Sequence, residues 1–315
     1  MSNRYHRFES FKVLAHADRL AMIAEDKIPA PVTWVIYPSN ACSYQCGHCI
    51  MAEEQKQYRA MLSPEAMAKV PGDAIRLGIK TVVFSGGGDP LLNPKTLETA
   101  RALNAQGIPT GINNQGYFLD DPTPFSFIRF SVDAATPQTY ERIHRVDGWD
   151  RVNTNISRVA KLRSNGAKIE LGLAFLITPL NWEEAEDFVV WGQQYQPDFI
   201  HLRPAYLDPA YMHEDYTDGA ETLQHTIIPR MAEMKERVER VWSNVFFRTD
   251  KFEGFWTPKQ YSKCRANPLM AVTAADGSFL ICQDRGIGGD DAALRWGNYN
   301  EQSFEIGRAS CRERV

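Results

Sequence analysis

The sequence has no apolar run near the roughly 18 residues that a membrane-spanning helix needs. Its first ten residues, MSNRYHRFES, lack the apolar core of a secretory signal peptide. Neither sign of charge dominates, because 35 basic and 39 acidic residues give a net charge of −4. This balance offers no electrostatic argument for nucleic acid or an anionic membrane as a partner. We therefore expect a cytoplasmic protein that binds neither.

Cysteine is also scarce, with 6 in the 315 residues, and three of the six lie between positions 42 and 49. In a reducing cytoplasm such a dense group indicates metal binding or catalysis more often than disulfides. The other three, Cys264, Cys282 and Cys311, are compatible with thiols that serve only packing.

The pattern of apolar residues predicts an α/β fold. From about residue 30, short apolar runs alternate with amphipathic stretches. Most runs are almost continuously apolar, as in parallel strands that are buried on both faces. The predicted strands are residues 32–37, 81–84, 109–113, 127–132, 169–177 and 199–203.

Helices are predicted between most of these strands and after the last one. Ser63-Pro64 and Thr136-Pro137 each place a capping side chain before a proline at the first helical position. Repeated β-then-α units with right-handed crossovers predict a partial parallel (β/α)6 barrel, similar to a TIM barrel, with its chemistry at the carboxyl ends of the strands. The predicted helices span about residues 64–77, 93–107, 138–144, 150–164, 181–195 and 220–242.

The last third of the chain does not continue this alternation of strands and helices. The helix over 220–242 carries an apolar stripe, which we interpret as core packing. Residues 269–273 and 278–282 predict a β-hairpin around Asp276-Gly277. We divide the chain into an N-terminal extension (1–29), the barrel (30–250), a small hairpin-containing appendage (251–304) and a tail (305–315). The stripe consists of Leu223, Ile227, Met231, Met234, Val238 and Val241.

The three close cysteines follow the first predicted strand. Residues 40–51 read N-A-C-S-Y-Q-C-G-H-C-I-M, so Cys42, Cys46 and Cys49 have the spacing Cys-x3-Cys-x2-Cys. A structural zinc site needs four ligands, and a ferredoxin-type cluster takes four cysteines. Three thiolates on a four-iron cluster would leave one iron open to an outside ligand. His48 could instead complete a zinc site, so zinc stays an alternative.

This loop after the first strand of a βα barrel resembles the signature of the radical S-adenosylmethionine (SAM) superfamily. The resemblance implies a 4Fe–4S cluster on Cys42, Cys46 and Cys49, whose open iron binds the amino and carboxylate groups of SAM. It implies that one electron splits the sulfonium and releases a 5′-deoxyadenosyl radical, which takes a hydrogen atom from the substrate. The family usually has an aromatic residue before the third cysteine; His48 stands there and can pack beside the adenine.

A second element supports the resemblance. Residues 81–90 read T-V-V-F-S-G-G-G-D-P, and Gly87-Gly88-Asp89-Pro90 is similar to the family's Gly-Gly-Glu-Pro, whose backbone contacts the SAM amino group. Glycine suits this role because a backbone without Cβ can approach a ligand closely. The shorter Asp89 replaces the usual glutamate.

Further polar residues at strand ends are candidate cofactor ligands by the same resemblance. Asn113, together with Asn114, resembles the asparagine after the third strand, and Ser131 and Asp133 resemble ribose-contacting positions. Asp133 is equally compatible with a capping or turn-forming role. Arg203 lies near His201 on the sixth strand, and its carboxylate partner could come from SAM or from the substrate.

The appendage resembles the start of an auxiliary-cluster domain of the SPASM or twitch type. Cys264, the hairpin, Cys282 and the following Trp296-Gly297-Asn298 carry this resemblance, which implies a possible second iron–sulfur cluster. The further cysteine pair that such domains use is absent from the sequence. Two unrelated thiols are the alternative reading.

The tail, E-I-G-R-A-S-C-R-E-R-V, resembles the translation of a sequencing-library adapter. We expect the natural chain to continue past about Phe304, Cys311 to be no ligand, and the last 11 residues to lack packed structure.

The resemblance therefore implies a radical SAM enzyme that acts on a small molecule or peptide and receives electrons from a donor such as flavodoxin or ferredoxin. Oxidation or bond formation is favoured over epimerisation, because no spare cysteine other than Cys311 is present to donate hydrogen, although a tyrosine could serve. The competing hypothesis is a non-catalytic zinc-binding or electron-transfer protein.

Overall fold

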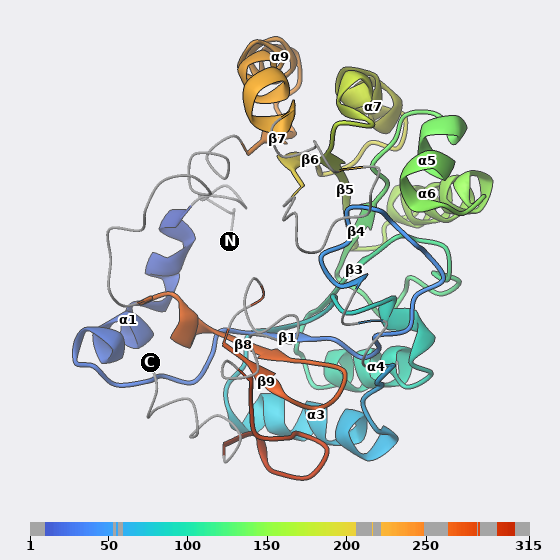
Figure 1. Cartoon of the computed structure of the whole chain (residues 1–315). Coiled ribbons are helices and arrows are strands. Elements are labelled where there is room, and N and C mark those ends of the chain that lie inside the picture. The colour runs from blue at the N-terminus through green and yellow to red at the C-terminus, as the bar shows by residue number, and fades with distance from the viewer. Residues whose placement is uncertain are drawn as a thin grey trace.

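The computed structural model describes residues 10–52, 55, 59–205, 216, 222–248, 264–281, 283 and 295–305. Its strands form one curved sheet in the order β10-β9-β8-β1-β2-β3-β4-β5-β6-β7, parallel from β8 to β7 and antiparallel from β8 to β10 (Figure 1). The sheet has two edges and so does not close. The strands are β1 (Thr33–Ile36), β2 (Thr81–Phe84), β3 (Thr110–Asn114), β4 (Phe127–Ser131), β5 (Glu170–Ile177), β6 (Phe199–Pro204), β7 (Val245–Phe247), β8 (Met270–Thr273), β9 (Phe279–Leu280) and β10 (Arg295–Trp296).

The fold class predicted from the sequence is confirmed as an open, partial parallel barrel. All six predicted parallel strands are present, and β2 has the predicted bounds. The structure adds a seventh parallel strand, β7, which pairs with β6 beyond the long C-terminal helix. Three residues, V-F-F, were too short a run to distinguish from a loop.

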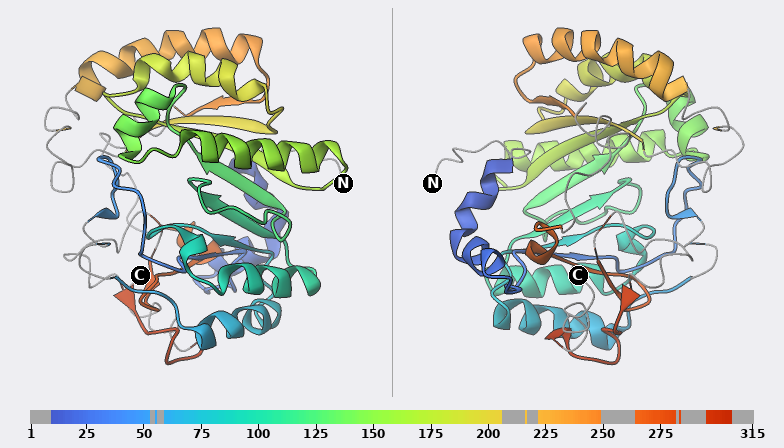
Figure 2. Two further views of the ribbon diagram at one scale, coloured as in Figure 1. Left: turned by 90° about the vertical axis from the view of Figure 1, so that its right-hand side faces the viewer. Right: turned by 60° about the vertical axis from the view of Figure 1, so that its left-hand side comes forward.

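Helices cover the outer face of this sheet, while α1 (Ala17–Ala24) lies across from them on the open side (Figures 1 and 2). The predicted caps are confirmed: Ser63 Oγ accepts from Ala66 N at 3.0 Å, and Thr136 Oγ1 accepts from Thr139 N at 3.3 Å. The outer helices are α3 (Pro64–Arg76), α4 (Thr96–Ala105), α5 (Pro137–His144), α6 (Trp149–Ser164), α7 (Ala185–Gln193) and α9 (Ile228–Val241).

Two helix predictions need correction. Helix α4 begins at Thr96 and not at 93, because the Asn93 side chain accepts from Lys95 N at 2.9 Å and forms a local turn. The apolar stripe of the last helix is buried, except that Val241 is 63% exposed. Val241 is the final residue of α9, where the chain turns into an extended conformation at Trp242 and leaves the packed face.

The two faces of the sheet are different. Alternation turns Trp34, Ile36 and Phe84 toward the helices, where they join the main core. It turns Val35 and Tyr37 toward the inside of the barrel, where they pack with Val272, Ala274 and Leu280. The inside of the barrel is thus apolar along β1, β8 and β9.

The predicted hairpin is confirmed and extends the barrel sheet. β8 and β9 are antiparallel around Gly277, whose φ is 92°. β8 also pairs in parallel with β1, and Trp34 Nε1 donates to Thr273 Oγ1 at 2.9 Å. The described parts of the appendage therefore share the barrel's sheet.

The end of the chain is described only up to residue 305. Glu305 forms an ion pair with Arg76 of α3. Residues 306–315 lie outside the described residues, so the expectation for the tail is not tested. Of the helices that the structure describes, none combines the length and apolarity that crossing a membrane requires.

Gly172 on β5 gives a test of this packing. A Cβ added there would lie 2.1 Å from Phe199 Cζ, whereas one added at Gly72, on the exposed side of α3, meets nothing within 4 Å. We expect Gly172→Ala to lower the free energy of unfolding by about 1–3 kcal/mol. Gly72→Ala should raise it by about 0.5–1 kcal/mol, because alanine is the better helix former. Urea titration measures both, and equal effects would contradict the packing described.

Candidate active site

The loop with the three cysteines lies against the glycine loop at the carboxyl ends of β1 and β2. Gly88 N donates to Ser39 O at 2.7 Å, and Asp89 N donates to Ala41 O at 2.8 Å. A Cβ at Gly88 would lie 1.9 Å from Ala41 O. Only glycine at position 88 permits this approach, so the two predicted motifs form one unit.

Each cysteine sulfur has a nitrogen of a neighbouring side chain beside it. Cys42 Sγ accepts from Gln115 Nε2 at 3.4 Å, and Cys49 Sγ accepts from Gln55 Nε2 at 3.9 Å. The same Gln55 nitrogen donates to Gly87 O at 2.6 Å and links the two loops. The sequence analysis missed both glutamines. Gln115 could have been predicted as a site residue, because it lies just after the third predicted strand, at the end of the sheet where the site was expected.

Cys46 contacts a histidine that the sequence analysis also missed. His144 Nδ1 lies 3.0 Å from Cys46 Sγ, and His144 Nε2 lies 2.8 Å from Val132 O. A carbonyl only accepts, so Nε2 carries the proton and Nδ1 accepts from the thiol. Burial lowers the pKa of His144 to about 4, which is consistent with this neutral tautomer.

The three thiols suit a thiolate-bound iron–sulfur cluster. They are partly buried and not in disulfides. Burial raises the pKa of Cys42 to about 11 and also raises the pKa of Cys46 and of Cys49. Raised values argue against reactive nucleophiles, because nucleophilic cysteines have lowered values. Ligation would remove the thiol protons, and sulfur is the donor that iron–sulfur clusters use.

A buried acid lies beside this loop. Asp133 has φ of 58°, and its Oδ1 accepts from Leu176 N of β5 at 2.6 Å, a long-range bond that is neither a helix cap nor a local turn. Its Oδ2 lies 3.8 Å from both His48 Nε2 and His144 Nε2. Burial raises the pKa of Asp133 to about 7 and lowers the pKa of His48 to about 3, so His48 is neutral. Asp133, His48 and His144 can therefore form hydrogen bonds to a ligand without forming a full ion pair with one another.

Several predicted ligands have buried polar atoms without a hydrogen-bond partner in the part of the chain that the structure describes. These atoms are His48 Nδ1, Asp89 Oδ2 and Asn113 Oδ1. The other atoms of two of these side chains are held in place: Asp89 Oδ1 accepts from Leu91 N at 2.8 Å, and Asn113 Nδ2 donates to Ser85 Oγ at 3.3 Å. A buried polar atom without a partner is costly, and a bound polar ligand would satisfy it.

The strand register brings the remaining predicted residues to one face. Asn113 pairs with Arg129, and Ser131 pairs through Ala174 with His201. Arg203 follows two residues later on β6, so alternation turns it to the same inner face as His201. Asn114 belongs to the opposite face, and its side-chain amide atoms have no partner among the described residues.

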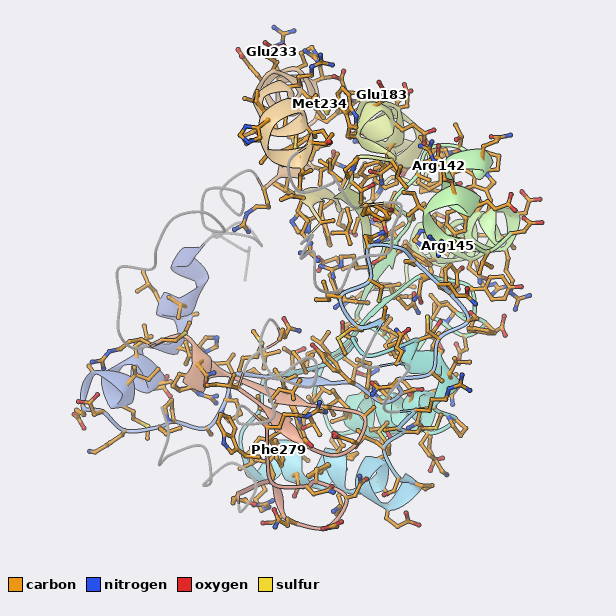
Figure 3. The ribbon with its side chains drawn as sticks, viewed as in Figure 1. Arg142, Arg145, Glu183, Glu233, Met234 and Phe279 are labelled. Atoms are coloured by element: carbon orange, nitrogen blue, oxygen red, sulfur yellow. The ribbon has the colours of Figure 1, made fainter. Side chains whose placement is uncertain are left out.

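Arg145 is a further residue that the sequence analysis missed. It directly follows α5, with φ of 58°, and is labelled in Figure 3. Its Nη2 lies 3.5 Å from the position of a Cβ on Gly47, between the second and third cysteines. A guanidinium group thus lies against the cysteine loop.

Of the two predicted ligands of an auxiliary cluster, the structure describes only Cys264. Cys264 is exposed and not in a disulfide. Cys282 and Cys311 lie outside the described residues. A second cluster on Cys264 and Cys282 therefore stays a prediction.

Comparison with known proteins identifies the class. Residues 36–191, from the end of β1 through most of α7, match the family model of the radical SAM superfamily. This match contains the last residue of β1, the cysteine loop, the glycine loop and strands β2 to β5. The chain belongs to the radical SAM superfamily.

Its relatives give two further findings. A probable GTP 3',8-cyclase of Metallosphaera sedula is 26% identical over 171 residues, which are 52% of this chain and 52% of the relative. The chain thus spans about half the length of this relative. One from Sulfurisphaera tokodaii is 24% identical over 276 residues, 79% of this chain and 81% of the relative.

Solved structures agree on the fold. Streptococcus suis SuiB bound to precursor peptide SuiA has a TM-score of 0.67 and 16% identity, covering 96% of this chain and 71% of SuiB. The anSMEcpe protein with bound AdoMet has a TM-score of 0.60 and 16% identity, covering 88% of this chain and 80% of that one. At this identity the likeness shows a shared fold.

The raised pKa of Asp89 predicts a pH dependence. Burial raises it from 3.8 to about 6 in the folded protein. Between these values the unfolded chain binds fewer protons than the folded one, so this carboxyl destabilises the fold as pH rises. Asp89→Asn removes the charge. We expect the free energy of unfolding of the variant to increase relative to that of the wild type, by up to about 3 kcal/mol, as pH rises from 4 to 7. Urea unfolding of cluster-free protein across this range measures the difference, and a constant difference would contradict the burial of Asp89.

Proposed function

We propose that this chain is a radical SAM enzyme whose 4Fe–4S cluster is held by Cys42, Cys46 and Cys49. The bound cluster would supply the electron that cleaves SAM to a 5′-deoxyadenosyl radical, which abstracts a hydrogen atom from the substrate. One observation carries the proposal: three cysteines share one loop that is docked on a glycine loop at the carboxyl ends of neighbouring parallel strands. In parallel barrels this end of the sheet is where active sites lie.

The surrounding side chains orient the thiolates. Gln115 and Gln55 direct N–H groups at Cys42 and Cys49, and such charge-assisted hydrogen bonds stabilise a thiolate more than a neutral thiol. His144 is held by its bond to the Val132 carbonyl and accepts from the Cys46 thiol only while that thiol is protonated, so it orients Cys46 before the cluster binds. Outer partners of this kind hold metal ligands in place and tune the metal.

SAM would bind between the cysteine loop and the inside of the barrel. Ser39, Asn40 and Ala41 pack directly against Gly87 and Gly88, which holds the glycine loop in place. The buried polar atoms that have no partner among the described residues supply hydrogen-bonding sites. We assign cofactor binding to His48, Gly87, Gly88, Asp89, Asn113, Ser131, Asp133 and Arg203.

The substrate is a small molecule or a peptide. The curated relatives carry the name GTP 3',8-cyclase, which supports a nucleotide-sized molecule. The likeness to SuiB, which was solved with a precursor peptide, supports a peptide instead. Electrons would come from a donor such as flavodoxin or ferredoxin. A second cluster on Cys264 and Cys282 would favour oxidation of a substrate radical.

The alternative function is a non-catalytic zinc or electron-transfer protein. A zinc ion needs several ligands around one point. Among the residues that the structure describes, no three His, Cys, Asp or Glu side chains are arranged in this way. A 4Fe–4S cluster does not need such convergence, because each thiolate binds a different iron. The arrangement therefore supports the cluster over zinc.

Anaerobic turnover tests the proposal. Protein reconstituted with iron and sulfide, then given dithionite and SAM, should form 5′-deoxyadenosine. The Cys42/Cys46/Cys49→Ala triple variant should form none, because no cluster is bound. Cys311→Ala is the matched control and should retain activity. Zinc in place of iron in protein kept anaerobic throughout, or equal product from the triple variant, would contradict the proposal.

A further inference from the structure

Helix α5 contacts the cysteine loop at three points, of which the assigned site uses one. The Tyr140 hydroxyl lies 2.7 Å from the hydroxyl of Tyr44, which stands between the first two cysteines. One turn further along the helix, the ring of His144 contacts the Cys46 sulfur. The backbone carbonyl of His144 also accepts from Gln45 N at 3.2 Å. Residues four apart lie on the same side of a helix, so one face of α5 holds the middle of the cysteine loop.

The two tyrosines form a buried pair. Tyr44 is 3% exposed and Tyr140 is fully buried. Their rings meet edge to face with centroids 6.4 Å apart, and the ring of His144 lies 5.3 Å from the ring of Tyr44. Each hydroxyl satisfies the other, and a buried hydroxyl that loses its partner is costly. The pair therefore fixes the first half of the cysteine loop against α5.

The helix is itself held at both ends. At its amino end, the Oε1 atom of Glu184, the residue directly before α7, accepts from the hydroxyls of Thr136 and Thr139 at 2.8 and 2.6 Å. The Oε2 atom accepts at 2.8 Å from the backbone N–H of the residue before this capping turn. At the carboxyl end, His144 Nε2 donates to Val132 O at 2.8 Å. The face of α5 that contacts the loop is thus fixed relative to the barrel.

We propose that Tyr140 and Glu184 are positioning residues, which act through α5 to hold the Cys46 part of the cysteine loop in place before the cluster binds. This inference rests on the proposed function, because the loop is the one assigned to the cluster. A site that is in its binding conformation for only a fraction of the time binds with an affinity reduced by that fraction. Tyr140 acts through Tyr44, and Glu184 acts through the helix cap, so both affect the cysteines indirectly.

Hydrogen exchange of the cluster-free full chain tests this inference in the absence of metal. The amide of Gln45, which donates to His144 O, reports the contact between the loop and the helix. Amides of β5 report opening of the whole barrel and serve as the reference. Relative to them, we expect Gln45 to exchange about fivefold faster or more in Tyr140→Phe and in Glu184→Ala, because each variant loses buried hydrogen bonds.

Two control variants lose comparable interactions away from the loop. Tyr195→Phe removes a buried hydroxyl that donates to Asn153 Oδ1 at 2.6 Å. Glu186→Ala removes an acid of α7 that pairs with Arg237. Both controls should leave the exchange of Gln45, measured against the β5 amides, as it is in the wild type.

The double variant Tyr44/Tyr140→Phe separates positioning from stability. It leaves neither hydroxyl without a partner, so its free energy of unfolding should return toward that of the wild type. The amide of Gln45 should nevertheless stay less protected, because the bond between the loop and the helix is gone. Wild-type protection of Gln45 in this variant, or in folded Tyr140→Phe, would overturn the inference.

Iron retention gives a second readout. Each variant is reconstituted at equal folded concentration and then titrated with an iron chelator. We expect Tyr140→Phe and Glu184→Ala to bind iron at least about tenfold more weakly than the wild type, which is the usual effect of losing a residue that holds a metal ligand in place. Tyr195→Phe should match the wild type. Equal retention in all folded variants would contradict a positioning role.

The two proposals fail differently. If wild-type protein loads no cluster but its variants show the expected exchange, the hold of α5 on the loop stands and the radical SAM function is removed. If the wild type forms 5′-deoxyadenosine and the variants exchange and retain iron as it does, only the positioning role is removed.

Discussion

The site depends on the contact between two backbone segments, the cysteine loop after β1 and the glycine loop after β2. Two N–H···O bonds, of 2.7 and 2.8 Å, join the two segments. They lie so close together that a Cβ at Gly88 would clash with Ala41 O. The parallel register of β1 and β2 brings both loops to the same edge of the sheet. The thiols, Gln55 and the inner polar residues are positioned relative to this contact, which uses backbone alone.

Burial then sets the chemistry around the contact. It keeps His48 and His144 neutral, raises the pKa of Asp133 to about 7 and stabilises protonated thiols. In the absence of metal the loop therefore carries little charge, and its polar groups are aligned by backbone bonds. Because ligation requires thiolates, cluster loading is coupled to proton release. The low dielectric that makes these groups costly to bury also strengthens their bonds to a ligand.

Local signals predicted much of this structure. Continuous apolar runs located β1 to β6, and Ser63 and Thr136 marked helix starts because capping depends on neighbouring residues. Long-range contacts left no such signal. His144 lies 98 residues from Cys46, and Gln115 lies 73 residues from Cys42. Pairing of β8 with β1 likewise joins distant segments. The inward direction of the Arg129 side chain was predictable, because Arg129 and Ser131 are two residues apart on one strand and so face the same side. The sequence analysis did not consider Arg129, which is a single charged residue in an otherwise apolar run.

The central claim is that three thiolates leave one iron of a cluster open to SAM. Electron paramagnetic resonance of the dithionite-reduced protein, recorded with and without SAM, tests it most directly. The account predicts a reduced 4Fe–4S signal that changes on addition of SAM, because SAM ligates the open iron. A reduced cluster whose signal is the same with and without saturating SAM would contradict it.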